Sequence, residues 1–228
     1  MWNLLIQLTF EVNMQKKKFL VDLGLTLFAI SMIGFGMSLI IKANLGQSTV
    51  SGFTNALAHV LNIKAGTVLI YFNLLCFVFE LILLGKKAKP ILILQPLLSL
   101  VFGNIVNFFL YDFSYLANLN LDQYGTQVIG LLIGIVLMSL GVSLMMSVKL
   151  VVLPYDAFIV VFSDHFKLPF VKVRTGADFI FVLSSLFMAW AFTLSYMPVR
   201  EGTVIFAFTV GSLIAYFSKF WRKILKLH

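Results

Sequence analysis

The sequence predicts an all-α integral membrane protein of six transmembrane helices, arranged as two inverted three-helix repeats that each contain an interrupted or re-entrant short helix. Three observations predict this fold: an apolar composition, six long apolar runs and a similarity between the two halves. The chain is 61% hydrophobic and 11% charged, with a mean hydropathy of +1.01, whereas soluble domains are about half apolar and a quarter charged. In water such a chain would expose large apolar patches, so a lipid bilayer is its expected solvent.

Six apolar runs are each close to the roughly 20 residues that cross the hydrocarbon core of a bilayer. They divide the chain into a cytoplasmic segment 1–18, a first repeat 19–112, an external loop 113–125, a second repeat 126–220 and a basic tail 221–228. The predicted spans are Phe19–Ile41, Gly66–Leu84, Ile91–Leu110, Thr126–Met146, Gly176–Leu194 and Thr203–Phe220.

The basic residues predict the orientation of these spans. With the N-terminus inside, fourteen lysines and arginines fall in cytoplasmic segments and three in external loops, as the positive-inside rule describes. We therefore expect a multi-pass protein of a bacterial inner membrane with both termini in the cytoplasm. Residues Trp2 to Phe10 are expected either to form an interfacial helix or to precede a translation start at Met14.

The two halves of the chain resemble each other at an offset of 105 positions. Gly36-Met-Ser-Leu corresponds to Gly141-Val-Ser-Leu, and Phe53 corresponds to Phe158. Because each half holds three spans, the second half must lie upside down relative to the first. Inverted repeats with interrupted helices recur in transporters, whose substrate sites lie near the midplane where the repeats meet.

Each half also contains a segment between spans that is too polar for a lipid-facing helix. In the first, Ser48 is a favourable N-cap for a helix from Thr49 to about Leu61. Ser51, Asn55 and His59 recur there at four-residue spacing and form a polar stripe. Thirteen residues give a helix of about 20 Å, which is too short to cross the membrane.

The second segment repeats this plan around Leu153-Pro154-Tyr155-Asp156. Pro154 suits the first turn of a helix, where its missing N–H is not needed. Asp156 follows two residues later, where a negative charge complements the positive end of the helix dipole. The predicted helix continues to Val161 or slightly beyond.

Two arrangements of these short helices stay open. Either they enter the membrane from opposite faces, so that their N-termini at Ser48 and Pro154 meet near the centre, or they lie flat at the membrane surfaces. In the first arrangement, backbone N–H groups at Ser48–Ser51 and Tyr155–Asp156 would bind an anionic group. Asp156 then either gates transport or couples it to protons; alternatively it only stabilises its own helix.

Polar residues elsewhere in the spans extend the candidate site. Asp178 is expected either to pair with Arg174 four residues earlier or to face a cavity. Asn104 is expected either to line the site or to form an interhelical hydrogen bond, and Glu80 to reach the cytoplasmic interface. The expected substrate-binding residues are Asn44, Ser48, Thr49, Ser51, Asn73, Asn104, Lys149, Tyr155, Asp156 and Asp178.

Several functional classes lack support in the sequence. The net charge of +8 comes from basic residues in short loops beside the spans, which is a sign of membrane topology and not of nucleic-acid binding. With one cysteine and three scattered histidines, we expect no metal site and no cofactor. The HExxH, GxSxG and glycine-rich phosphate-loop motifs are missing, so we do not expect an enzyme.

Two motifs carry a resemblance to a known group of proteins. Lys42-Ala-Asn-Leu-Gly-Gln-Ser48 and Leu150-Val-Val-Leu-Pro-Tyr-Asp156 are similar to runs in the YczE/YitT-like family of bacterial multi-span membrane proteins. The likeness covers about residues 20–220. It departs from the family pattern in both copies: the first has Thr49 and Ser51 in place of proline and aspartate, and the second has Val151 in place of glycine. The resemblance implies a polytopic inner-membrane protein, often supposed to be a permease, and supplies no substrate.

The sequence therefore favours a permease or facilitator for a small polar metabolite, with an anionic solute as one option. Its expected partners are the lipid bilayer and that solute, and a homodimer stays an open option. Two alternatives belong to other functional classes. One is an accessory protein that does not transport and docks a partner enzyme; the other is a lipid-handling protein.

Overall fold

The computed structural model describes residues 16–119, 121–194 and 196–225, and every regular element in these ranges is a helix. The long helices are α2 (Lys16–Ala43), α4 (Ala65–Leu84), α5 (Leu94–Asn107), α7 (Tyr124–Val148), α9 (Phe170–Ala191) and α10 (Glu201–Ile224). The short helices are α3 (Thr49–Leu61), α6 (Ser114–Ala117), α8 (Pro154–His165), η1 (Gly85–Lys87), η2 (Pro90–Ile93) and η3 (Phe108–Asp112). The all-α prediction is confirmed. The expectations about Trp2 to Phe10 and Met14 lie outside the described residues.

Five helical stretches of the described residues are long and apolar enough to cross a membrane, which supports the prediction of a membrane protein. The fifth predicted span, Gly176–Leu194, lies largely in α9, which has spanning length but carries Lys172, Arg174 and Asp178 in its first half. The five stretches are Phe19–Ala43, Ala65–Lys87, Pro90–Asp112, Tyr124–Val148 and Glu201–Ile224.

The two predicted short helices begin where local signals place them. Ser48 caps α3, since its Oγ accepts a hydrogen bond from Ser51 N at 3.2 Å, and Pro154 is the first residue of α8. The starts of α3 and α8 are 105 positions apart, as are those of α4 and α9. The same offset separates two pairs of residues with left-handed backbone, which are Asn44 and Lys149, and Asn62 and Lys167.

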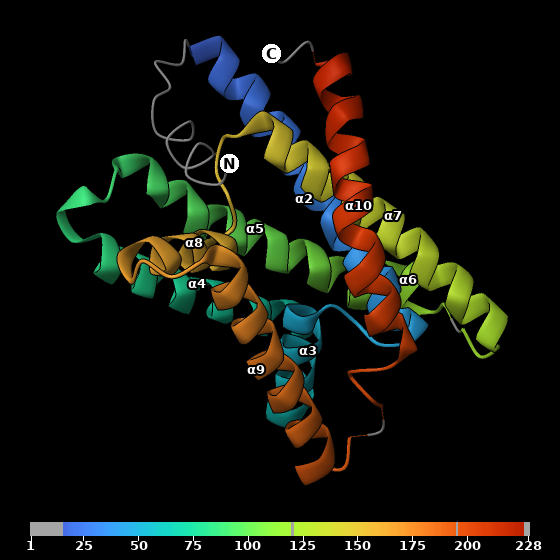
Figure 1. The fold of residues 1–228 in the computed structure, drawn as a ribbon. Coiled ribbons are helices and arrows are strands. Elements are labelled where there is room, and N and C mark those ends of the chain that lie inside the picture. Colours follow the sequence, from blue (N-terminus) through green and yellow to red (C-terminus); the bar gives the residue numbers. More distant parts are fainter. Residues whose placement is uncertain (1–15, 120, 195, 226–228) are drawn as a thin grey trace.

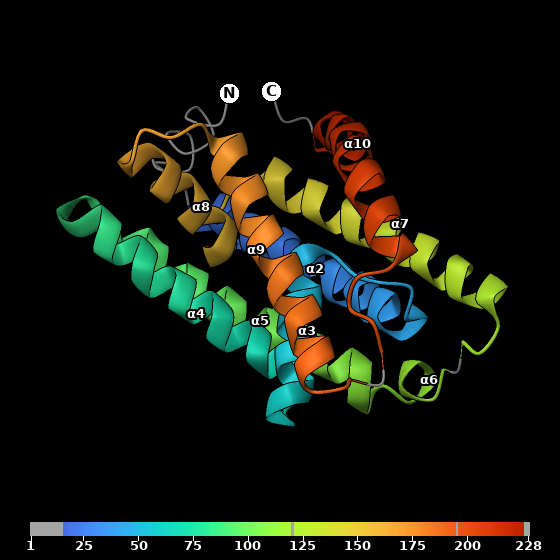
Figure 2. The ribbon, with the colours of Figure 1, turned by 60° about the horizontal axis from the view of Figure 1, so that its bottom comes forward.

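The helices α2 and α7 pack along each other at the centre of the molecule (Figure 1). Helix α10 packs against α7, while α5 packs against α2 and α4. The short helices contact long helices of both halves: α3 packs against α4 and α9, and α8 packs against α4 and α9 (Figure 2). Helix α9 therefore contacts both short helices.

Glycines bring helix backbones together at two crossings. A Cβ atom on Gly36 of α2 would lie 2.7 Å from Gly134 O of α7. A Cβ atom on Gly66 of α4 would lie 2.0 Å from Gly103 O of α5. Small residues allow membrane helices to approach this closely, and van der Waals contact then stabilises their association.

The outward faces of α9 and α10 are apolar, which suits contact with lipid. Phe179, Phe187 and Trp190 on α9 are exposed, as are Phe208 and Tyr216 on α10. The beginning of α2 and the end of α10 lie at the same end of the molecule, at the top of Figure 1.

Candidate functional site

A charged cluster lies where α9 passes the first turns of α3 and α8. Helix α9 supplies Arg174 and Asp178, α8 supplies Tyr155 and Asp156, and α3 supplies Thr49. We call these five residues the Arg174 cluster. Four of them are among the predicted site residues, and Arg174 is the expected ion-pair partner of Asp178.

Arg174 connects the two short helices through both aspartates. Its Nη1 donates a hydrogen bond of 2.5 Å to Asp156 Oδ1, and its Nε lies 3.4 Å from Asp178 Oδ2. Thr49 Oγ1 in turn donates a hydrogen bond of 2.5 Å to Asp178 Oδ1. The predicted pairing of Arg174 with Asp178 is present, and the contact with Asp156 adds the second helix.

The cluster is half-buried and has more negative than positive groups. The side chains of Arg174, Asp156 and Asp178 are 34%, 38% and 29% exposed. The N-terminus of a helix carries a partial positive charge, and here each short helix presents its first turn to a carboxylate. With all three groups ionised, two carboxylates share one guanidinium, so an incoming anion would have to replace one of them.

Tyr155 and Asn73 fix the start of α8. The Arg174 guanidinium carbon lies 4.7 Å from the centroid of the Tyr155 ring, a cation–π contact. Tyr155 N donates a hydrogen bond to Asn73 Oδ1 at 3.4 Å, and Asn73 Nδ2 donates to Leu69 O at 2.9 Å. Asn73 therefore lies next to the Arg174 cluster and holds the start of α8.

The hydroxyl oxygen of Tyr155 is buried and finds no hydrogen-bond partner among the described residues. The aromatic rings of Phe72 and Phe181 pack beside Tyr155, with ring centroids 5.6 and 5.7 Å away. Buried polar atoms are usually hydrogen-bonded. This hydroxyl is therefore a buried polar group that the described residues leave unsatisfied.

Two of the backbone groups expected to bind an anion already have partners. Ser51 N donates to Ser48 Oγ, and Tyr155 N donates to Asn73 Oδ1. The predicted residues Asn44 and Lys149 lie at the ends of α2 and α7, in left-handed conformation. Their place at the start of the two loops makes them structural neighbours of the short helices, and Asn44 O accepts a hydrogen bond from Arg200 Nη1 at 2.8 Å.

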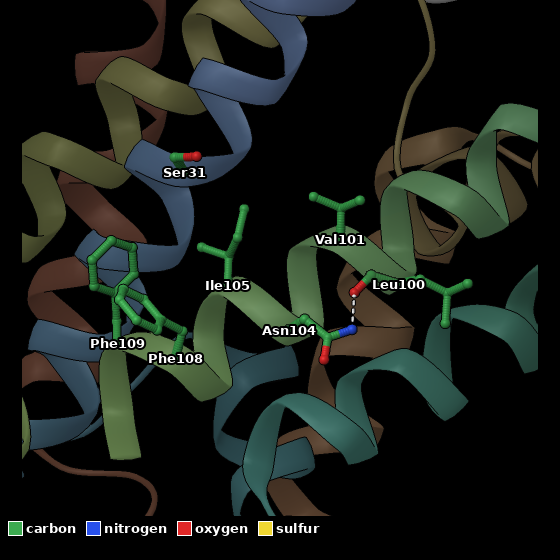
Figure 3. Close-up of a pocket in the computed structure, with 7 residues that line it drawn as sticks. All are labelled: Ser31, Leu100, Val101, Asn104, Ile105, Phe108 and Phe109. Atoms are coloured by element: carbon green, nitrogen blue, oxygen red, sulfur yellow. Dashed lines mark hydrogen bonds between the residues drawn. The ribbon is translucent and has the colours of Figure 1, made fainter. Parts of the chain in front are cut away.

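Asn104 lies in a groove between α2 and α5, apart from the residues of the Arg174 cluster (Figure 3). Asn104 Nδ2 donates to Leu100 O of its own helix at 2.8 Å. The interhelical hydrogen bond is made instead by Asn107, whose Oδ1 accepts from Gly66 N at 2.8 Å. The groove has a volume of about 550 Å³ and is lined by Ser31, Leu100, Val101, Asn104, Ile105, Phe108 and Phe109.

The expected position of Glu80 at the membrane interface is wrong. Its side chain is 2% exposed and lies between α4 and α5, where Glu80 Oε1 accepts a hydrogen bond from Gln95 Nε2 at 3.1 Å. The interface position rested on the distance of Glu80 from Lys86 along the chain. Helix α5 packs over Glu80 and buries it. The spacing of residues along the chain does not predict this contact between two helices.

Comparison with known proteins gives the family. A family model described as a family of unknown function, DUF6198, matches residues 20–219. The chain belongs to this family. The matched residues include both short helices and the whole Arg174 cluster. The match does not name the YczE/YitT-like group, so the resemblance to that group stays an interpretation. No curated protein and no solved structure matches the chain.

The cap of α3 gives a first testable prediction for this DUF6198 protein. Replacing Ser48 by alanine removes the acceptor for Ser51 N and is expected to lower the free energy of unfolding by about 1 kcal/mol. Thermal unfolding in detergent measures the change. Ser31→Ala is the matched control, because the Ser31 hydroxyl bonds Leu27 O within its own helix. An equal loss of stability in both variants would contradict a specific role for the cap.

Proposed function

We propose that the chain is a small membrane permease or facilitator for a small polar metabolite, and that an anionic group of this solute binds Arg174 in exchange for Asp156. The observation that carries the proposal is the contact of one half-buried arginine with Asp156 in the first turn of α8, together with its link to Thr49 in the first turn of α3 through Asp178. Helix N-termini attract anions, and arginine binds carboxylates and phosphates through a planar set of donors.

We further propose the architecture of six spans in two inverted three-helix repeats, with α9 as the fifth span and with α3 and α8 as re-entrant helices. The offset of 105 positions between the starts of α3 and α8, and between those of α4 and α9, supports it. Contacts of each short helix with a long helix of the other half also support it. Charged groups at membrane depth are tolerated where they are paired or face a watery cavity, and the Arg174 ion pairs satisfy the first condition.

The proposed orientation has both termini on the cytoplasmic side of a bacterial inner membrane. The bias of lysines and arginines supports this orientation. The position of the beginning of α2 and the end of α10 at one end of the molecule agrees with it (Figure 1).

In the proposed mechanism, Asp156 and the solute compete for the same guanidinium. Without solute, Asp156 holds Arg174 and links α8 to α9. When the solute's anionic group replaces Asp156, this link between α8 and α9 opens and Tyr155 Oη gains a partner. When the solute leaves, Asp156 returns to Arg174, so the ion pair acts as a gate.

Uptake by reconstituted protein tests this proposal. Liposomes containing the protein are supplied, one compound at a time, with radiolabelled small carboxylic acids and inorganic phosphate. For a compound that is transported, Asp156→Asn is expected to tighten binding severalfold and to reduce uptake about tenfold, because Arg174 loses its competitor and also the group that displaces the solute. Arg174→Gln is expected to abolish binding.

Lys64→Gln is the control, since Lys64 forms an exposed ion pair with Asp112 away from the cluster, at 3.3 Å. Its uptake is expected to equal that of the wild type. Transport that is unaffected by both Asp156→Asn and Arg174→Gln would refute the proposed site. Scrambling of lipid in the same liposomes without any added solute would favour the lipid-handling alternative.

A further inference from the structure

Glu80 and Gln95 form a polar pair in the apolar interior between α4 and α5. Their side chains are 2% and 3% exposed. Gln95 Nε2 donates to Glu80 Oε1 at 3.1 Å. This single hydrogen bond leaves Glu80 Oε2 and Gln95 Oε1 buried and without a hydrogen-bond partner among the described residues.

A charged Glu80 would be poorly stabilised at this position. Among the described residues, no lysine or arginine lies within ion-pair distance of its carboxyl group. Cys76, one turn earlier on α4, is a nearby ionisable group, and it supplies no positive charge. An unpaired carboxylate buried away from water is strongly disfavoured, and such a group takes up a proton instead.

One proton would satisfy both unpaired atoms. A protonated carboxyl group has one O–H donor and keeps an acceptor, while the amide of glutamine offers both a donor and an acceptor. Glu80 Oε2–H can then donate to Gln95 Oε1 while Glu80 Oε1 keeps its bond from Gln95 Nε2. The result is a closed pair of hydrogen bonds with no net charge.

We propose that Glu80 and Gln95 form a buried proton-binding site, in which Glu80 is a neutral carboxylic acid paired reciprocally with Gln95. Release transfers the proton to water and leaves the carboxylate, and this requires α5 to move Gln95 away or water to reach the pair.

The location of the pair suggests its use, and this step rests on the proposed permease function. Asn73, Cys76 and Glu80 are all buried on one face of α4. Glu80 lies seven residues beyond Asn73, or about 10 Å along the helix, towards the end of α4 that is predicted to be cytoplasmic. Because Asp156 is engaged by Arg174, Glu80 is the better candidate for coupling solute movement to protons.

Infrared spectroscopy of the purified full-length protein tests the protonation directly and requires no transported solute. The difference spectrum between wild type and Glu80→Gln at neutral pH is expected to contain the C=O stretching band of a protonated carboxylic acid, shifted in deuterium oxide. Glu80→Gln is nearly isosteric and always neutral. Asp156→Asn is the control and is expected to leave this band unchanged.

Gln95→Leu tests the pairing itself. Loss of the hydrogen bonds to Gln95 is expected to move the carboxyl band to higher frequency, because hydrogen bonding weakens the C=O bond. Reaction with dicyclohexylcarbodiimide, which modifies protonated carboxyl groups in membranes, gives a second readout. The adduct is expected on the Glu80 peptide by mass spectrometry, and Glu80→Gln is expected to lose it.

The absence of the carboxyl band from the wild type, together with absence of the adduct, would overturn the proton-binding site. A band that does not move in Gln95→Leu would overturn the pairing. These results are independent of uptake, so a failed transport assay leaves them intact. If uptake is found, a pH gradient is expected to drive it in the wild type, and Glu80→Gln is expected to lose this dependence while retaining solute exchange. A gradient that still drives Glu80→Gln would overturn the coupling role.

Discussion

Arg174→Gln is expected to lower the free energy of unfolding by about 2 kcal/mol. Removing the guanidinium leaves Asp156 and Asp178 close together without their shared counter-ion. Exposed ion pairs contribute about 0–1 kcal/mol, and removing one partner of a buried pair costs about 3–5 kcal/mol. Because the Arg174 cluster is half-buried, the expected loss of stability lies between these two values. Thermal unfolding in detergent measures the change.

A second substitution distinguishes charge repulsion from lost packing. Adding Asp156→Asn to Arg174→Gln removes one of the two stranded carboxylates and is expected to restore about 1 kcal/mol. Lys64→Gln, in a more exposed ion pair, is expected to cost less than about 1 kcal/mol. If the double variant is less stable than Arg174→Gln alone, the loss comes from packing, and the electrostatic account of the cluster is wrong.

Gly103→Ala is expected to destabilise the protein by about 3 kcal/mol, the upper end of the usual range for overpacking. A Cβ atom at this position would lie 2.4 Å from Gly66 O and 2.3 Å from Ile70 Cγ1. The backbone oxygen cannot move aside unless α4 and α5 separate. Their separation would also weaken the buried hydrogen bond from Gly66 N to Asn107 Oδ1.

Gly211→Ala is the matched control for this prediction. A Cβ atom on Gly211 of α10 would meet no atom within 4 Å, and alanine is the better helix former by about 1 kcal/mol. Thermal unfolding is therefore expected to show unchanged or slightly higher stability for Gly211→Ala. Equal destabilisation by both substitutions would mean that the α4–α5 contact is not the cause.

The starts of the short helices could be predicted because the signals are local. Ser48 caps α3 by accepting a hydrogen bond from the backbone N–H of Ser51, three residues away. Pro154 favours the start of α8 because its ring fixes the backbone angle φ near the helical value. The positions of the five helices that are long and apolar enough to cross a membrane could be predicted for a similar reason, since a run of apolar residues of sufficient length is a property of the segment itself.

The contacts within the candidate site were predicted only in part. Arg174 and Asp178 are one helical turn apart, so their ion pair follows from spacing. Arg174 and Asp156 are 18 positions apart and meet because α8 and α9 pack together. Asn104 is polar and lies within a predicted span, yet it faces the groove at α2 and bonds its own helix (Figure 3).

The sequence by itself determined that the chain is helical, that several of its helices are long and apolar enough to cross a membrane, and that two short helices lie between long ones. The length of an apolar run and the residue that caps a helix are properties of one segment. The offset of 105 positions comes from comparing two segments of the same sequence, so all three are visible in the sequence. Only the tertiary structure decided which charges meet and which are buried. Arg174 joins α3 to α8, and Gln95 covers Glu80, because the rotation and crossing of packed helices bring together side chains that no spacing rule relates.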